Sequence, residues 1–139
     1  MRLADYDHMP SVAALMTPFP FSVSPRDPVP RALALMEQHA FHHVPVREDG
    51  RVVGLVSERD LRAAPPDRTV GDALCPRPYT VELGAPLAGV LREMARRRIG
   101  SAVVVRGGKL AGILTSTDVC RALAEILEDR FQPRGGEAA

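Results

Sequence analysis

The chain carries one pattern of residues twice, with an offset of 58 residues between the copies. The segment GLVSERD, Gly54–Asp60, returns as GILTSTD, Gly112–Asp118. The same offset relates other positions along the chain, among them Val12 and Val70, Pro28 and Pro86, Leu33 and Leu91, and Met36 and Met94. An internal repeat constrains the fold more strongly than any local pattern, because each copy must form the same supersecondary unit. Two copies predict a twofold-like pair of units rather than a long solenoid.

The bulk composition is that of one folded domain. With 139 residues, of which 45% are hydrophobic and 25% charged, the chain can bury a sizeable core. A net charge of +1 gives no general basic field, so we expect neither a nucleic-acid nor a membrane partner. No stretch approaches the roughly 18 apolar residues of a membrane span, and the start has no signal-peptide pattern. Cys75 and Cys120 have neither disulfide-framework nor metal-site spacing, so we expect a cytoplasmic protein.

Apolar spacing and turn residues predict the same order of elements in both copies, namely helix, strand, helix, strand, strand, helix. In the first copy these elements are expected at 11–16, 21–23, 28–40, 44–46, 52–56 and 57–61, with helix caps at Ser11, Asp27 and Ser57. In the second copy they are expected at 70–74, 79–81, 86–98, 102–105, 110–114 and 115–131.

These elements predict an α+β fold. We expect an irregular lead-in over 1–10, a first repeat over 11–67, a second over 68–131 and a disordered tail over 132–139. A lone three-stranded sheet cannot cover its own apolar face. The two repeats should therefore pack together through their sheets as one module.

The turn before the last helix of each repeat contains candidate ligand-binding residues. Ser57 or Thr115 would cap a helix whose first backbone N–H groups and dipole favour an anion such as phosphate. Asp60 or Asp118, three residues further on, could accept hydrogen bonds from a vicinal diol such as ribose. A single Ser/Thr-x-x-Asp turn is most often only a capping box. Its duplication in register favours a ligand-binding role.

The repeat resembles the CBS domain, named after cystathionine β-synthase. In the first copy the likeness rests on Met16–Pro18, Ala32–Met36, His43–Val46 and Glu48–Asp60. In the second copy it rests on Val90–Met94, Val103–Val105 and Gly112–Asp118. The resemblance covers about residues 11–125.

The resemblance implies tandem CBS repeats, called a Bateman module, in which the repeats are related by pseudo-twofold symmetry. Such pairs commonly dimerise into a disk and bind adenosine nucleotides in clefts between the repeats. It therefore implies a regulatory sensor for AMP, ADP, ATP or a related adenosine derivative, acting as a homodimer on an unidentified partner protein. It implies neither a required cofactor nor catalytic residues.

The resemblance also implies two clefts, each with a ribose-binding Asp, a phosphate side and a base side. The residues implied for the first cleft are Asp60, Ser57, Arg59, His42, His43, Pro78, Tyr79, Thr80 and Ala102. The residues implied for the second cleft are Asp118, Thr115, Thr117, Pro20, Phe21, Ser22 and Val44.

The two implied clefts differ in charge. Where the first has His42 and His43, the second has Gly100 and Ser101, which carry no cation. Because phosphates favour Arg or Lys, we expect a phosphorylated ligand in the first cleft, beside Arg59. The second cleft suits a less charged adenosine compound, or none.

Two alternatives remain open. The repeats could form a dimerisation and docking module with empty clefts. A third hypothesis, ranked below both, is a metal or redox sensor that uses Cys75 or the histidines His39, His42 and His43. No nearby ligand set completes a tetrahedral site, so we expect no metal.

Overall fold

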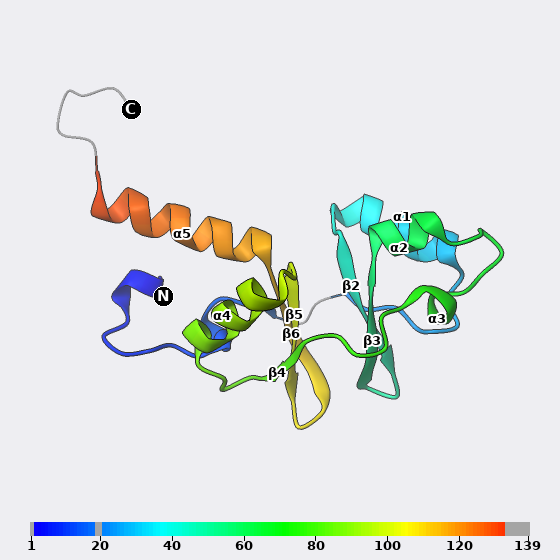
Figure 1. Cartoon of the computed structure of the whole chain (residues 1–139), viewed down its shortest axis with the longest axis horizontal. Helices are drawn as coiled ribbons and strands as arrows, with labels where there is room; N and C mark the ends of the chain where they lie inside the picture. Colours follow the sequence, from blue (N-terminus) through cyan, green and yellow to red (C-terminus); the bar gives the residue numbers. More distant parts are fainter. Residues whose placement is uncertain (1, 19–20, 133–139) are drawn as a thin grey trace.

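The computed structural model describes residues 2–18 and 21–132 (Figure 1). The expected α+β fold of tandem repeats is confirmed. In chain order the elements, with 3₁₀-helices written η, are η1 (Leu3–Asp5), η2 (Val12–Ala14), β1 (Thr17–Pro18), α1 (Val29–His39), β2 (His43–Glu48), β3 (Arg51–Ser57), α2 (Glu58–Ala63), α3 (Val70–Ala73), β4 (Thr80–Glu82), α4 (Leu87–Arg97), β5 (Ser101–Arg106), β6 (Lys109–Thr115) and α5 (Ser116–Arg130).

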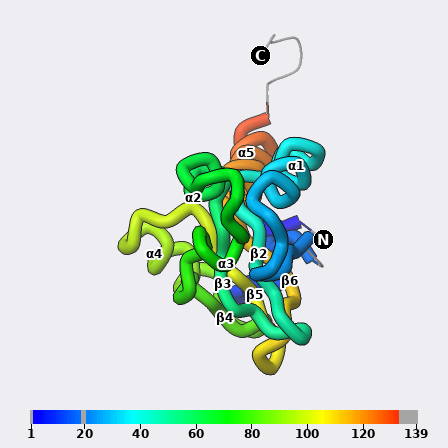
Figure 2. Tube along the Cα trace, turned by 90° about the vertical axis from the view of Figure 1, so that its right-hand side faces the viewer, coloured from blue at the N-terminus to red at the C-terminus, as the bar shows by residue number. Residues whose placement is uncertain are grey.

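The strands form one mixed sheet of six strands in the order β2-β3-β6-β5-β4, with β1 pairing the free part of β6. The hairpins β2–β3 and β5–β6 are antiparallel, and β4 runs parallel to β5. The two halves join edge to edge where Arg51 on β3 pairs with Lys109 on β6. These two residues are equivalent in the repeat, so the pseudo-twofold axis passes between them. Figures 1 and 2 show α1, α2 and α5 at one end of the molecule and both hairpin tips at the other.

The repeats exchange their first segments. Val70 of the second repeat is buried in the core of the first, beside Val29, Met36 and Leu61. In return, Val12 is buried in the core of the second repeat. Backbone hydrogen bonds fix both exchanges, from Val12 N–H to the Ala85 carbonyl (2.8 Å) and from Val70 N–H to the Asp27 carbonyl (2.8 Å). Each core therefore needs residues from both repeats, and Figure 1 shows α3 packed beside α1 and α2.

Gly54 and its repeat equivalent Gly112 are needed where these exchanged segments cross the hairpins. A Cβ at Gly54 would lie 2.7 Å from the Cys75 carbonyl oxygen, and a Cβ at Gly112 would lie 2.9 Å from that of Thr17. Cys75 forms two backbone hydrogen bonds with Leu55 at this crossing, of 3.0 and 2.7 Å. The Gly in each repeat thus lets a second backbone approach the strand closely.

Several local expectations were wrong. Asp27 does not cap α1, because its carboxylate accepts a hydrogen bond from Ser24 N–H (2.8 Å) and Pro28 takes the N-cap position. The strand expected at 21–23 is reduced to a single bridge between Val23 and Val46. Strand β1 was not expected at all. The bridge at Val23 and strand β1 each depend on a partner strand that is distant in sequence.

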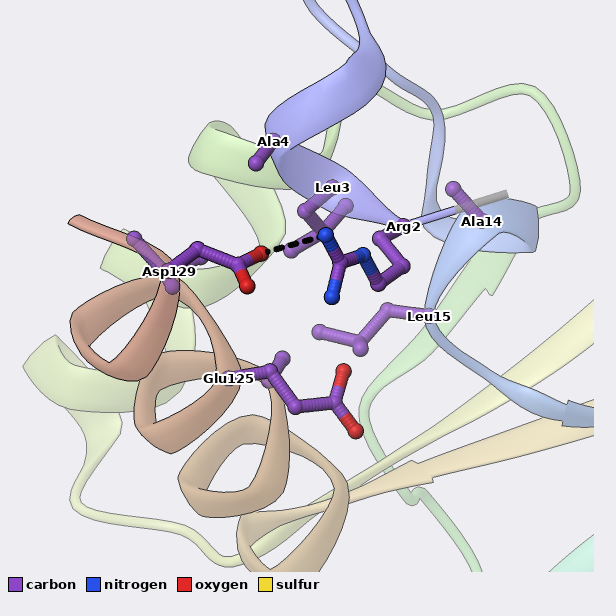
Figure 3. A pocket seen from close by; sticks show the side chains of 9 residues that line it. Arg2, Leu3, Ala4, Ala14, Leu15, Glu125 and Asp129 are labelled. Atoms are coloured by element: carbon purple, nitrogen blue, oxygen red, sulfur yellow. Dashed lines mark ion pairs between the residues drawn. The ribbon is translucent and has the colours of Figure 1, made fainter. Parts of the chain in front are cut away.

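The expected irregular lead-in contains η1, which packs against α5. Arg2 donates to Asp129 across a distance of 2.9 Å, and the two segments enclose a small pocket of about 150 Å³. Figure 3 shows the Arg2 side chain reaching Asp129, with Leu3 and Leu15 beside it. This contact holds one side of α5 against the second half of the molecule.

Candidate functional site

A cavity of about 560 Å³ lies between the first repeat and the start of α5. It opens beside the start of β2 and the end of β6, at the end of the molecule that carries α1, α2 and α5 (Figure 1). The lining residues come from both repeats, and they are Thr17, Pro18, Phe21, His39, Ala40, Phe41, His42, His43, Pro45, Gly100, Ile113, Thr115, Ser116, Thr117, Asp118 and Arg121.

The first turn of α5 forms one wall of this cavity and is held by a complete capping box. Asp118 accepts hydrogen bonds from the Thr115 N–H (2.9 Å) and hydroxyl (3.1 Å), and Thr115 Oγ1 accepts from Asp118 N–H (3.4 Å). The Thr17 hydroxyl donates to the other carboxylate oxygen of Asp118 at 3.2 Å. Asp118 is only 7% exposed. Three of the roughly four acceptor positions of the carboxylate are therefore already occupied.

Positive and titratable groups line the same cavity. The Arg121 guanidinium lies one helical turn from Asp118, with Nη1 3.7 Å from Oδ1. His42 is exposed, and its Nδ1 lies 2.9 Å from the Glu58 carboxylate. Burial and the neighbouring His42 lower the pKa of His43, and the nearby Asp60 carboxylate partly opposes them. His43 is therefore neutral at pH 7, and Arg121 is the permanent cation of this wall.

Three aromatic rings also line the cavity. The Phe21 and His39 rings stack with centroids 4.2 Å apart, and His39 stacks on Phe41 at 5.4 Å. Phe21 keeps half of its surface exposed. An exposed aromatic ring beside a cavity is a surface on which a flat heterocycle can stack.

The equivalent turn of the first repeat is more open. Ser57 caps α2 by accepting a hydrogen bond from Asp60 N–H at 3.0 Å. The Asp60 side chain is exposed, and within the described ranges its carboxylate accepts no hydrogen bond. Tyr79, the equivalent of Phe21, lies under the Arg97 guanidinium at 4.6 Å, and Arg97 is the equivalent of His39. The two clefts therefore share a frame and differ in side chains.

A second cavity of about 330 Å³ lies near the hairpin tips. It is lined by Arg51, Val52, Val53, Pro76, Arg77, Pro78, Thr80, Val105 and Gly108. Neither cavity is lined by Ser57, Arg59 or Asp60. The residues implied for the first cleft are thus divided between the α2 turn, the Arg97–Tyr79 pair and this cavity.

For the second cleft, the structure brings Thr115, Thr117, Asp118 and Phe21 together. Ser22 is half-buried but does not line the cavity, and Pro20 lies outside the described residues. Val44 requires a correction, because its side chain is 1% exposed and belongs to a core.

His42 and His43 line the cavity of Asp118. They also lie beside the turn of the first cleft, where His43 pairs with Ser57 in the sheet and His42 contacts Glu58. Their assignment to the first cleft stays a prediction, and one other residue of that cleft requires a correction. Ala102 is fully buried in the second core, so its side chain cannot contact a base.

The expectation that the Asp118 cleft has no cation was also wrong, because Arg121 lines it. The lining residues that sequence reasoning did not assign to this cleft include His39, Phe41 and Arg121. The spacing of Asp118 and Arg121 on one helix was a usable signal, since residues three apart share a face. The positions of His39 and Phe41 depend on how α1 ends at Ala40, whose φ is 56°.

Within the described ranges, 2–18 and 21–132, no helix is both long and apolar enough to cross a membrane. Within the same ranges, no three His, Cys, Asp or Glu side chains come together as a metal-binding group.

The fold and the paired turns define a tandem repeat module with a cleft between its halves. The sequence model of the CBS domain matches residues 12–67 and 70–125. The chain belongs to the CBS domain family and carries two CBS domains in tandem.

Solved CBS structures are similar over most of the chain. AcuB from Vibrio cholerae is 26% identical with a TM-score of 0.82, covering 91% of this chain and all of that one. CBSX2, solved in complex with AMP, is 30% identical with a TM-score of 0.76, covering 84% of this chain and 98% of that one. The CBS domain of a bacterial CNNM/CorC family Mg²⁺ transporter, solved with ATP, is 30% identical with a TM-score of 0.73, covering 83% and 87%.

Among curated proteins, a zinc metalloprotease of Methanocaldococcus jannaschii is 34% identical over 114 residues, which cover 82% of this chain and 32% of that protein. The chain spans less than a third of the length of the first curated relatives it matches. The likeness therefore concerns the CBS part of these proteins.

Proposed function

We propose that this chain is a regulatory module that binds an adenosine nucleotide in the cavity beside Asp118 and relays the bound state to a partner protein. The observation that carries the proposal is the cavity itself, which is lined by aromatic rings, a helix N-terminus and a cation. Its volume of about 560 Å³ lies within the usual range for small-molecule sites. The complexes of CBSX2 with AMP and of the transporter CBS domain with ATP support this ligand class.

The phosphate would lie at the start of α5. Ser116 N–H donates to the Gly100 carbonyl at 2.9 Å, and Asp118 N–H donates to Thr115. Among the described residues the Thr117 N–H has no such acceptor, so it is available to an anion at the end of a 15-residue helix. Arg121 would pair with the phosphate, since a guanidinium can bind it through two parallel hydrogen bonds.

The base would lie against Phe21, on its exposed side. Stacking of a base on an aromatic ring contributes about 1–3 kcal/mol. Asp118 would mainly set the geometry of the turn, with one acceptor position left for a ribose hydroxyl. Asp60, which has a free carboxylate, would be the ribose acceptor if the first cleft also binds.

Calorimetric titration with AMP, ADP, ATP and S-adenosylmethionine tests the proposal. We expect Arg121→Gln to weaken the best nucleotide about tenfold or more, because one charge-assisted contact is lost. Phe21→Ala should weaken it to a similar extent. Tyr79→Ala is the control matched by the repeat, and it should leave the affinity unchanged.

Each contrary result has a defined meaning. Full affinity in the Arg121 and Phe21 variants, with loss in Asp60→Ala, would move the site to the first cleft. If the folded wild-type protein binds no nucleotide, the sensor proposal is refuted and the docking module is the remaining candidate function.

A specific observation favours the docking module as a second candidate. Helix α5 exposes Leu123, Leu127 and Phe131, which are 54%, 48% and 71% exposed and recur every fourth residue. They form one apolar stripe on the side of α5 that solvent reaches. If a second copy packs antiparallel, Leu123 of one copy lies opposite Leu127 of the other.

Because that pairing buries the apolar stripe, we propose a homodimer through α5. Sedimentation should then show a dimer that Leu127→Lys converts to a monomer, with Met9→Lys, another exposed apolar position, as the control. A monomeric wild-type protein would exclude this dimer. Helix α5 contributes to both the cavity and the stripe, so a bound phosphate can change dimer stability, which would be the relay.

A further inference from the structure

The junction between the two halves gathers positive charge. Arg51 on β3 lies directly opposite its repeat equivalent Lys109 on β6. Lys109 in turn lies opposite Arg106 across the β5–β6 hairpin. Like charges directly opposite each other in a sheet are destabilising. The sequence therefore places repulsion at the one bridge that joins β3 to β6.

A cavity adjoins this junction and adds a fourth cation. Arg51 and Arg77 both line the space of about 330 Å³, and no acidic residue lines it. A Cβ built at Gly108 would lie 2.5 Å from Arg51 Nη1, so the guanidinium lies directly against the turn of the other hairpin. Gly108 therefore both permits the positive φ of 82° and leaves room for this guanidinium.

The nearby carboxylates do not neutralise these groups. Glu48 lies opposite Arg51 in the β2–β3 hairpin, yet its side chain pairs with Arg26 at 3.3 Å. Glu82 lies opposite Val105 on the strand beyond. Over residues 2–18 and 21–132, the ion pairs include none of the four cations Arg51, Arg77, Arg106 and Lys109.

We propose that this cavity is an anion site that binds phosphate groups of a polyphosphorylated ligand, separately from the Asp118 cavity. Two guanidinium groups converge on it, and guanidinium matches phosphate oxygens in charge and geometry. A bridging anion would replace the repulsion across the β3–β6 bridge by attraction. Binding would then stabilise the junction between the two CBS domains and fix their relative position.

The experiment uses inorganic tripolyphosphate, which has no base to stack elsewhere. Thermal unfolding of the full chain is followed with increasing tripolyphosphate, against sodium chloride at matched ionic strength. We expect a saturable rise in melting temperature beyond that in chloride, because a ligand of the native state stabilises it. Arg77→Gln should weaken the apparent affinity about tenfold or more.

Two variants make the result specific. Arg51→Gln should lose the tripolyphosphate effect, yet melt no lower than wild type in its absence, because it removes a like-charge pair. Arg92→Gln, an exposed arginine on α4, changes the net charge equally and should change the affinity less than twofold. The proposed site would be overturned if the Arg77 and Arg92 substitutions weakened the apparent tripolyphosphate affinity equally. It would also be overturned if tripolyphosphate raised the melting temperature of the wild-type protein no more than chloride does.

Nucleotide titrations separate this site from the Asp118 cavity. Arg77→Gln should leave AMP binding unchanged where Phe21→Ala weakens it. Chemical shifts of the Gly107 and Gly108 amides should move with tripolyphosphate in the wild-type protein and stay fixed in Arg77→Gln. Shifts confined to the first turn of α5 would assign the anion to the other cavity and refute this proposal.

Discussion

Asp60 and Asp118 are equivalent in the repeat, yet their carboxylates have different surroundings. Asp118 is 7% exposed and accepts three hydrogen bonds, one of them from Thr17 on β1. Asp60 is exposed, and the residue equivalent to Thr17 is Cys75, a weak donor. The repeated frame therefore provides two turns of the same shape. The exchanged segment beside each turn decides whether its Asp closes the turn or remains free for a ligand.

The largest expected effect comes from removing the two carboxylates in turn. Asp118→Ala should destabilise the protein by about 3 kcal/mol, because it removes a cap and leaves part-buried Thr115 and Thr17 donors without an acceptor. Asp60→Ala should change stability by no more than about 0.5 kcal/mol, as expected for an exposed side chain. Urea unfolding of both variants measures the difference.

A milder substitution tests the contribution of Thr17, which donates a hydrogen bond to Asp118. Thr17→Cys should cost about 1 kcal/mol, because it removes one of the hydrogen bonds to Asp118. Equal destabilisation by Asp60→Ala and Asp118→Ala would show that the two turns are equivalent and would break the comparison.

The next prediction tests a feature that the two repeats share, namely the glycine at which a second backbone crosses the hairpin. Gly54→Ala and Gly112→Ala should each cost about 1–3 kcal/mol, because the new Cβ meets a backbone carbonyl of the crossing segment. Gly84→Ala is the control, since nothing lies within 4 Å of its Cβ position. In thermal unfolding, Gly84→Ala should have a clearly higher melting temperature than Gly54→Ala and Gly112→Ala. A neutral result at either repeated glycine would show that its crossing segment can move away.

The sequence predicted these shared features well and the differences poorly. The offset of 58 residues, the hairpins and the caps at Ser57 and Thr115 are local patterns, and the structure confirms them. The exchange of Val12 and Val70 between the cores is a long-range arrangement that hydrophobic spacing does not specify.

In the candidate site, too, local patterns could be predicted from the sequence and spatial arrangement could not. Thr115, Thr117, Asp118 and Phe21 could be grouped from the family pattern, and the cavity contains them all. The assignment of His42 and His43 to the first cleft stays a prediction, because both residues stand between the two turns. His42 contacts Glu58, next to Ser57, while both rings line the cavity of Asp118. Sequence spacing cannot decide between two neighbours in space.

The smallest effect distinguishes the two repeats by pH. His43 is equivalent to Ser101, which does not titrate. Burial and His42 hold the pKa of His43 below its usual value of 6.5, and Asp60 partly opposes this shift. As the pH falls, the unfolded chain therefore takes up this proton before the folded protein does. The stability contributed by neutral His43 is complete above about pH 6.5 and declines as the pH falls below it.

His43→Ser, which installs the residue of the second repeat, should therefore reduce the loss of stability between about pH 7.5 and pH 5.5. The measurement is the urea midpoint of wild type and variant at both pH values. His8→Ser, at an exposed histidine of the N-terminal segment, is the control, and it should change the pH dependence less. An unchanged pH dependence in His43→Ser would mean that His43 takes up its proton equally in the folded and unfolded chains. His43 would then contribute nothing to the difference in pH dependence between the two repeats.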